Sequence, residues 1–104
     1  MKTATCTLHV DADHPCLAGH FPGDPVVPGV LILERIAAAL GRFRPDVRVI
    51  GIRQAKFLRA LRPGQRMTVS LRAAVTGEIA FEGRIDSTVH VRGAFLVQPG
   101  PSSP

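Results

Sequence analysis

The sequence predicts an α+β fold in which one long helix lies against a curved antiparallel sheet. The apolar stretch 30–40 has the length and composition of a helix. Five other segments alternate polar and apolar residues or are rich in β-branched residues, which is typical of strands. The last four of these follow one another through short turns, and such a run favours antiparallel pairing.

The first strand is expected at 3–11, where threonines and a histidine alternate with apolar residues. The remaining strands are expected at 46–58, 66–75, 79–85 and 89–97. A Pro-Gly pair at 63–64 and Gly77 mark two of the turns between them. We treat the chain as a single domain over 1–98, followed by a flexible Pro/Ser tail over 99–104.

Pro28 is expected in the first turn of the helix, where proline is favoured, and the apolar helical stretch follows it. The helix should end near Leu40 or Gly41, since glycine is a common helix stop. The apolar composition predicts a helix buried on most sides. Its carboxylate, Glu34, should therefore lie in a largely dry environment, which would favour the protonated carboxyl.

Composition narrows the class of protein. The chain has 104 residues with 45% hydrophobic content, which argues against disorder. No apolar run reaches the ~20 residues of a membrane span, and the N-terminus lacks the apolar core of a signal peptide. We therefore expect a cytoplasmic protein with no membrane contact, in which Cys6 and Cys16 are free thiols.

The formal charge is +5, and basic residues are concentrated between 42 and 66. This excess predicts an acidic partner. Nucleic acid is not favoured, because the few aromatic residues are all phenylalanine and no binding motif accompanies them. The alternative for these charges is a solvated face.

A loop rich in proline and glycine precedes the helix. Its residues 18–29 read A-G-H-F-P-G-D-P-V-V-P-G, and each proline fixes φ and removes a backbone donor. The loop should be stiff, and it carries His20. An imidazole on a rigid loop, followed by a carboxylate on a helix, is typical of an acid–base site.

Residues 19–34, G-H-F-P-G-D-P-V-V-P-G-V-L-I-L-E, resemble the signature of the 3-hydroxyacyl-[acyl carrier protein] dehydratases of fatty-acid synthesis, the FabZ and FabA type. Residues 56–64, K-F-L-R-A-L-R-P-G, resemble the second signature of that family more weakly. The strand–loop–helix–four-strand order also agrees with the hotdog fold of this family, a curved sheet wrapped around one helix.

The resemblance implies reversible dehydration of a 3-hydroxyacyl thioester to a trans-2-enoyl thioester, in fatty-acid or polyketide-type synthesis. His20 would act on the α-carbon proton, and Glu34, fourteen positions later, would assist departure of the 3-hydroxyl. The backbone N–H groups of Gly29 and Val30 would stabilise the thioester oxygen. The loop residues expected around the substrate are Phe21, Pro22, Gly23 and Pro28.

The resemblance also implies partners. The substrate would arrive on the phosphopantetheine arm of acyl carrier protein, with no metal and no soluble cofactor. Lys56, Arg59 and Arg62 are candidates to contact this acidic protein. A homodimer is implied, in which the histidine and the acid of one site come from opposite chains. A zinc site built on His9, His14, Cys16 and His20 is disfavoured, because their spacing matches no compact ligand pair.

Three departures from the family pattern keep other functions open. Ala38 replaces a glutamine that supports the acid in relatives, the chain contains no tyrosine to gate an acyl tunnel, and the segment before the signature is short. The first alternative is a catalytically degenerate hotdog subunit that binds an acyl chain or a partner. The second is a hotdog thioesterase, which is disfavoured because such enzymes do not generally carry the G-H-F-P-G loop.

Overall fold

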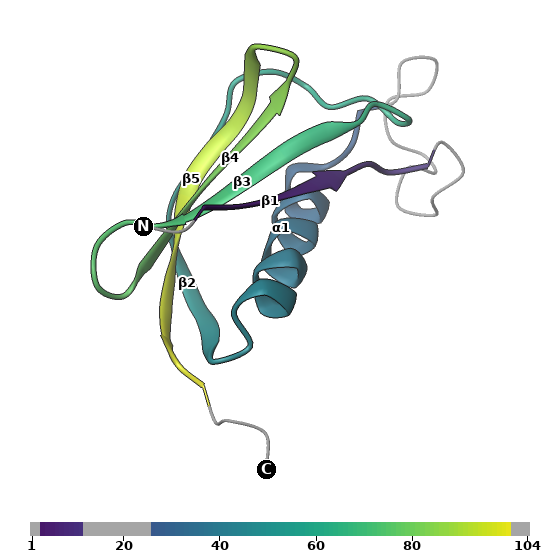
Figure 1. The fold of residues 1–104 in the computed structure, drawn as a ribbon. Coiled ribbons are helices and arrows are strands. Elements are labelled where there is room, and N and C mark those ends of the chain that lie inside the picture. The colour runs from purple at the N-terminus through teal and green to yellow at the C-terminus, as the bar shows by residue number, and fades with distance from the viewer. Residues whose placement is uncertain (1–2, 12–25, 101–104) are drawn as a thin grey trace.

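One five-stranded antiparallel sheet packs against one helix in the computed structural model, which describes residues 3–11 and 26–100 (Figure 1). The elements are β1 (Thr3–Leu8), α1 (Gly29–Phe43), β2 (Val47–Phe57), β3 (Met67–Ala73), β4 (Glu78–Ile85) and β5 (Thr88–Pro99). The strand order is β1-β3-β4-β5-β2, and every neighbouring pair is antiparallel. The predicted α+β class and all five predicted strands are confirmed.

The core lies between the helix and the face of the sheet that is turned toward it (Figure 1). Alternate residues of β3 and β4 point into this layer, as the period of a strand requires, and a hydrophobic face of the helix closes it. Its most buried members include Ile36, Leu40, Leu61, Met67, Val69, Leu71, Val91 and Phe95. Within this core, the rings of Phe81 and Phe95 lie 4.8 Å apart between centroids.

Gly93 allows the closest backbone approach in the sheet. It lies between Phe81 of β4 and Ala55 of β2 in the strand register. A β-carbon at this position would lie 2.7 Å from Cζ of Phe81 and would overlap the carbonyl oxygen of Gln54. Because one of these obstacles is backbone, only glycine lets β5 pair with β2 while the Phe81 ring covers it.

The helix differs from the prediction in two ways. It runs through Gly41 to Phe43, where the N–H of Arg44 donates to the carbonyl of Leu40 at 2.7 Å and Pro45 follows. The helix is also not buried on most sides. Only one face is buried, formed by Leu31, Ile32, Ile36, Ala39 and Leu40. Val30 and Ala38 are apolar in composition but exposed, which explains the error.

Strand β5 is longer than predicted. It continues through Pro99, into the segment expected to be a flexible tail, and Gly100 donates its N–H to the carbonyl of Asp46 at 2.9 Å. The pairing of Val47 with Pro99 explains this extension, because the long strand β2 provides a partner along this end of β5. Residues 101–104 lie outside the described part of the chain.

We predict that Gly93→Ala lowers the free energy of unfolding by about 3 kcal/mol or more, because backbone and a packed ring must both move. Gly41→Ala is the matched control, since a β-carbon there meets nothing within 4 Å. In the helix interior it should raise the free energy of unfolding by about 0.5–1 kcal/mol. Urea unfolding of both variants measures the difference, and equal midpoints would contradict the packing argument.

Candidate active site

The segment between β2 and β3 ties together the two chain positions that flank residues 12–25. Val27 donates its N–H to the carbonyl of Leu61 at 2.8 Å, and Gly64 donates to the carbonyl of Val10 at 2.8 Å. The side chains of Val10, Val27 and Leu61 are all buried in the core. The approach to the helix and the exit from β1 are therefore held by the same short segment.

The turn within this segment forms as its sequence predicts. The N–H of Gln65 donates to the carbonyl of Arg62 at 3.1 Å, and Gly64 adopts a φ of 85°. This left-handed conformation suits glycine two residues after the start of a turn whose second residue is Pro63. The N–H of Arg62 also donates to Oε1 of Gln65 at 2.8 Å, which closes the turn from both sides.

Pro28 caps the helix rather than occupying its first turn. Its φ of −59° and ψ of 140° are extended, and its carbonyl accepts from the N–H groups of Leu31 at 3.1 Å and Ile32 at 3.2 Å. Gly29 and Val30 are then the first two helical residues, whose N–H groups have no carbonyl one turn earlier to bind. These are the two predicted oxyanion donors, at the positive end of the helix dipole.

A pocket of about 280 Å³ lies beside this helix terminus. It is mostly apolar, and its lining residues are Val26, Val27, Gly29, Ile32, Phe57, Leu58, Arg59, Ala60 and Leu61. The ring of Phe57 packs on Gly29, because a β-carbon at position 29 would lie 2.8 Å from Cζ of Phe57. The lack of a side chain at Gly29 thus lets an aromatic wall stand directly against the amide donors.

Glu34 lies on the exposed face of the helix, so the prediction that the chain alone buries it is wrong. The buried face points the other way, toward the sheet. Val30, Glu34 and Ala38 follow one another at intervals of four residues and form one exposed stripe. The acid and a candidate amide donor therefore share one helix face, and Ala38 is one turn further along it.

Helix geometry places Val30 and Glu34 on one face, and Pro28 and Gly29 adjoin Val30 at the helix terminus. The loop residues His20, Phe21, Pro22 and Gly23 lie outside the described residues, as do His14 and Cys16. The roles of these residues remain predictions.

The three predicted carrier contacts do not share one surface. Arg59 lines the pocket at the helix terminus and is exposed. Arg62 is exposed in the following turn. Lys56 lies opposite Arg92 in the β2–β5 ladder. It is next in sequence to Phe57, whose ring points to the helix side of the sheet, so the side chain of Lys56 points to the side away from the helix. Of the three, Arg59 is the one placed at the candidate site.

His90 was not identified from the sequence, and it helps to shape the pocket. Its carbonyl accepts from the N–H groups of Leu58 at 2.8 Å and Arg59 at 3.2 Å, and its Nδ1 lies 3.2 Å from the carbonyl of Ala60. The side chain is buried, at 9% exposure. It holds the chain that forms one wall of the pocket. No motif surrounds it, so only the fold reveals its role.

Three further findings concern the described residues alone. Among them, no three histidine, cysteine, aspartate or glutamate side chains come together as metal ligands would. None of their helical segments is both long and apolar enough to traverse a bilayer. The thiol of Cys6 is free.

A model of the ApeI-like dehydratases matches residues 1–94 of this sequence. The chain belongs to this dehydratase family. The match spans the helix, the candidate site and most of the sheet, and it ends within β5.

Named relatives agree with this membership. The 3-hydroxyacyl-[acyl-carrier-protein] dehydratase FabZ of Haemophilus influenzae is 33% identical over 100 residues, covering 74% of this chain and 68% of the relative. FabZ of Chlamydia pneumoniae is 35% identical, covering 83% of this chain and 65% of that protein. The matches extend well beyond the short signature around His20 and Glu34.

The fold of this dehydratase also recurs in solved structures. The dehydratase heterocomplex ApeI:P from Xenorhabdus doucetiae aligns with a TM-score of 0.81 at 22% identity, over 91% of this chain and 86% of that one. A probable thioesterase from Bartonella henselae aligns with a TM-score of 0.60 at 15% identity, over 98% of this chain and 95% of that one. At such identities these likenesses establish the hotdog fold, which confirms the predicted architecture.

We predict that Gly29→Ala displaces the Phe57 ring from the helix terminus, since the new methyl group would occupy its place. The ring is the movable end of a half-exposed side chain, so the free energy of unfolding should fall by only about 1 kcal/mol or less. The loss of enoyl-forming rate, expressed as a free energy of activation, should be larger than this loss of stability. The double variant Gly29→Ala/Phe57→Leu should recover part of the lost rate. An unchanged rate in Gly29→Ala would contradict the proposed closeness of the Phe57 ring to the amide donors.

Proposed function

We propose that this chain dehydrates 3-hydroxyacyl thioesters carried on acyl carrier protein to trans-2-enoyl thioesters. The observation that carries the proposal is the alignment of Glu34 with the free helix terminus, beside an apolar pocket, in a member of a dehydratase family. The relatives named FabZ support the same substrate class.

In the proposed reaction His20 removes a proton from the α-carbon, and the released electron pair develops toward the thioester oxygen. The N–H groups of Gly29 and Val30 stabilise that oxygen, because helix-terminal donors are unpaired and the dipole is positive there. The electron pair then forms the Cα–Cβ double bond as the C–O bond breaks. Glu34 donates a proton to the leaving hydroxyl, which departs as water.

Proton balance needs no other reagent. After the step His20 holds the α-proton and Glu34 is ionised, and transfer of one proton between them restores the starting state. We therefore propose that the reaction requires neither a metal nor a soluble cofactor. Imidazole as a residue type suits this exchange, because its unperturbed pKa of about 6.5 lies close to neutral pH.

We further propose that a second copy of a hotdog chain completes the site. Strand β2 is an edge of the sheet, and it is long and mostly exposed. Exposed apolar side chains lie along it and beside the helix terminus, namely Val30, Val49, Ile50, Ile52, Phe57 and Leu58. An unpaired apolar edge of this length favours strand pairing with another chain. Such pairing would also cover the stripe that carries Glu34.

The second copy is proposed to be this same chain, as the family resemblance implies. The solved dehydratase named as an ApeI:P heterocomplex gives the other possibility, a different chain on the same edge. In that case this chain could supply only part of a site. The free thiol of Cys6 is compatible with the reducing cytoplasm, where we expect the enzyme to act.

We predict that His20→Ala and Glu34→Gln each lower the rate of enoyl formation by about 10²–10⁴-fold, since both remove a proton-transfer group. Glu34 is exposed, so Glu34→Gln should leave the free energy of unfolding within about 0.5 kcal/mol. Absorbance of the enoyl product on a carrier-bound 3-hydroxyacyl substrate measures the rate.

Arg35→Gln, also exposed and next in sequence, is the matched control and should keep the wild-type rate. No turnover by the wild type on several acyl lengths would favour the degenerate binding subunit. Release of free thiol without enoyl product would favour a thioesterase. Full activity in Glu34→Gln would contradict the role of Glu34 as the proton donor.

We predict that Ile50→Lys dissociates the proposed dimer and lowers turnover in parallel, because it places a charge on the apolar edge. Val75→Lys is the control, since Val75 is at least as exposed as Ile50, at 63% against 55%, but lies in the β3–β4 connection away from β2. Analytical ultracentrifugation and the enoyl assay measure both effects. A monomeric Ile50→Lys variant with full activity would overturn the proposal that two chains complete one active site.

A further inference from the structure

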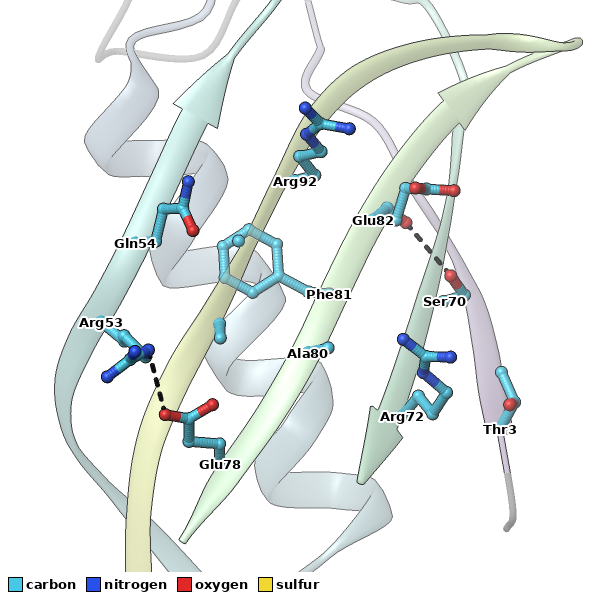
Figure 2. Close-up of a pocket in the computed structure, with 12 residues that line it drawn as sticks. Thr3, Arg53, Gln54, Ser70, Arg72, Glu78, Ala80, Phe81, Glu82 and Arg92 are labelled. Atoms are coloured by element: carbon cyan, nitrogen blue, oxygen red, sulfur yellow. Dashed lines mark hydrogen bonds and ion pairs between the residues drawn. The ribbon is translucent and has the colours of Figure 1, made fainter. Parts of the chain in front are cut away.

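A second hollow lies on the face of the sheet turned away from the helix. Figure 2 shows its lining residues on the strands, with the helix behind them. Its volume is about 530 Å³, larger than the pocket at the helix terminus and within the range of small-molecule sites. Neither Glu34 nor the helix terminus lines this hollow, so the proposed dehydration leaves it without a role.

The strand register explains why this face is hollowed. One row of residues crosses all five strands in the order Thr3, Arg72, Ala80, Ala94 and Gln54. The two alanines lie side by side at its centre, between longer side chains on either flank. Two methyl groups surrounded by long polar side chains form a floor with a polar rim.

The rim carries more positive than negative charge. Three arginines line it, Arg53, Arg72 and Arg92, against Glu78 and Glu82. Each carboxylate already has a cation: Glu78 lies 3.2 Å from Nε of Arg53, and Glu82 binds Arg84 of its own strand. Figure 2 marks the first of these pairs with a dashed line.

Arg92 occupies a position that normally favours a cross-strand ion pair. It lies directly opposite Glu82 in the β4–β5 ladder, yet the carboxylate of Glu82 turns to Arg84 instead. On its other side Arg92 lies opposite Lys56, a like charge, and such pairs destabilise a sheet. Within residues 3–11 and 26–100, no carboxylate pairs with the guanidinium of Arg92 or of Arg72.

We propose that this hollow binds a small organic anion with more than one carboxylate or phosphate group. Arg72 and Arg92 lie two strands apart, roughly 10 Å across the sheet, and are offset by two residues along the strands, because Arg72 is in register with Ala94 and Arg92 with Glu82. Two anionic groups on one ligand can therefore meet two guanidiniums, whose planar forks suit carboxylate and phosphate oxygens. The hydroxyl of Thr3 and the amide of Gln54 offer further hydrogen bonds at the rim.

A second copy of the chain does not fit this face. It would bring its own arginines against Arg72, Arg92 and Lys56, and like charges in contact disfavour association. A small anion, by contrast, would relieve the repulsion between Lys56 and Arg92. The site is independent of the proposed dehydratase function, because it shares no residue with the candidate active site.

The test is calorimetric titration of the full chain with citrate and, separately, pyrophosphate, which carries two phosphate groups, at an ionic strength fixed by sodium chloride. We expect saturable binding of at least one, and about tenfold or greater weakening in the double variant Arg72→Gln/Arg92→Gln. Tighter citrate binding would identify a ligand with several carboxylates, and tighter pyrophosphate binding a ligand with phosphate groups. Arg35→Gln/Arg66→Gln removes the same charge from exposed positions outside the hollow and should bind as the wild type does.

Ala80→Leu provides a second variant that changes no charge. It fills the floor and should abolish binding while the enoyl-forming rate stays at the wild-type value. The absence of saturable binding by the wild type would overturn the proposal, as would equal weakening in both double variants. Loss of carrier-protein binding in Arg72→Gln/Arg92→Gln, with no small-anion binding by the wild type, would also overturn it and favour a protein docking face.

Discussion

The structure depends on burying one face of a single helix against one curved sheet. Leu31, Ile32, Ile36 and Leu40 satisfy that requirement, and the sheet supplies the facing residues. One helix cannot cover every apolar surface of such a sheet, however. The opposite helix face and the β2 edge stay exposed, and these are the surfaces that carry Glu34 and the apolar row along the edge. The surfaces that the proposed dimer would cover are thus the same as those assigned to the proposed chemistry.

A second constraint comes from the short connection between β2 and β3. Its backbone accepts from Val27 and donates to Val10, and its own path is held by the backbone and ring of His90. The helix terminus, the pocket wall and the exit from β1 are therefore fixed to one another by hydrogen bonds rather than by one large core. A substitution in this connection should therefore displace the amide donors at the helix terminus more than it displaces the strands of the sheet.

The sequence predicted the strands well, because turn residues such as Pro63, Gly64 and Gly77 separate segments with a clear period of two. It predicted the helix but not its exposed side. Alanines around Glu34 look apolar in composition, and the position of the sheet decides which of them are covered. The pairing of β1 with β3 and of β2 with β5 brings together segments that are not consecutive. The role of His90 and the hollow over Ala80 depend on that register, so no local pattern predicts them.

The exposure of Glu34 gives the proposed dimer a chemical purpose as well as a structural one. The proposed mechanism requires this carboxyl to give its proton to the leaving hydroxyl, and exclusion of bulk water from the site strengthens the interactions that position the two groups. The chain alone does not supply that cover, since its buried helix face points to the sheet. A second hotdog chain on the β2 edge would supply it, so assembly and the exclusion of water from the acid would depend on the same contact.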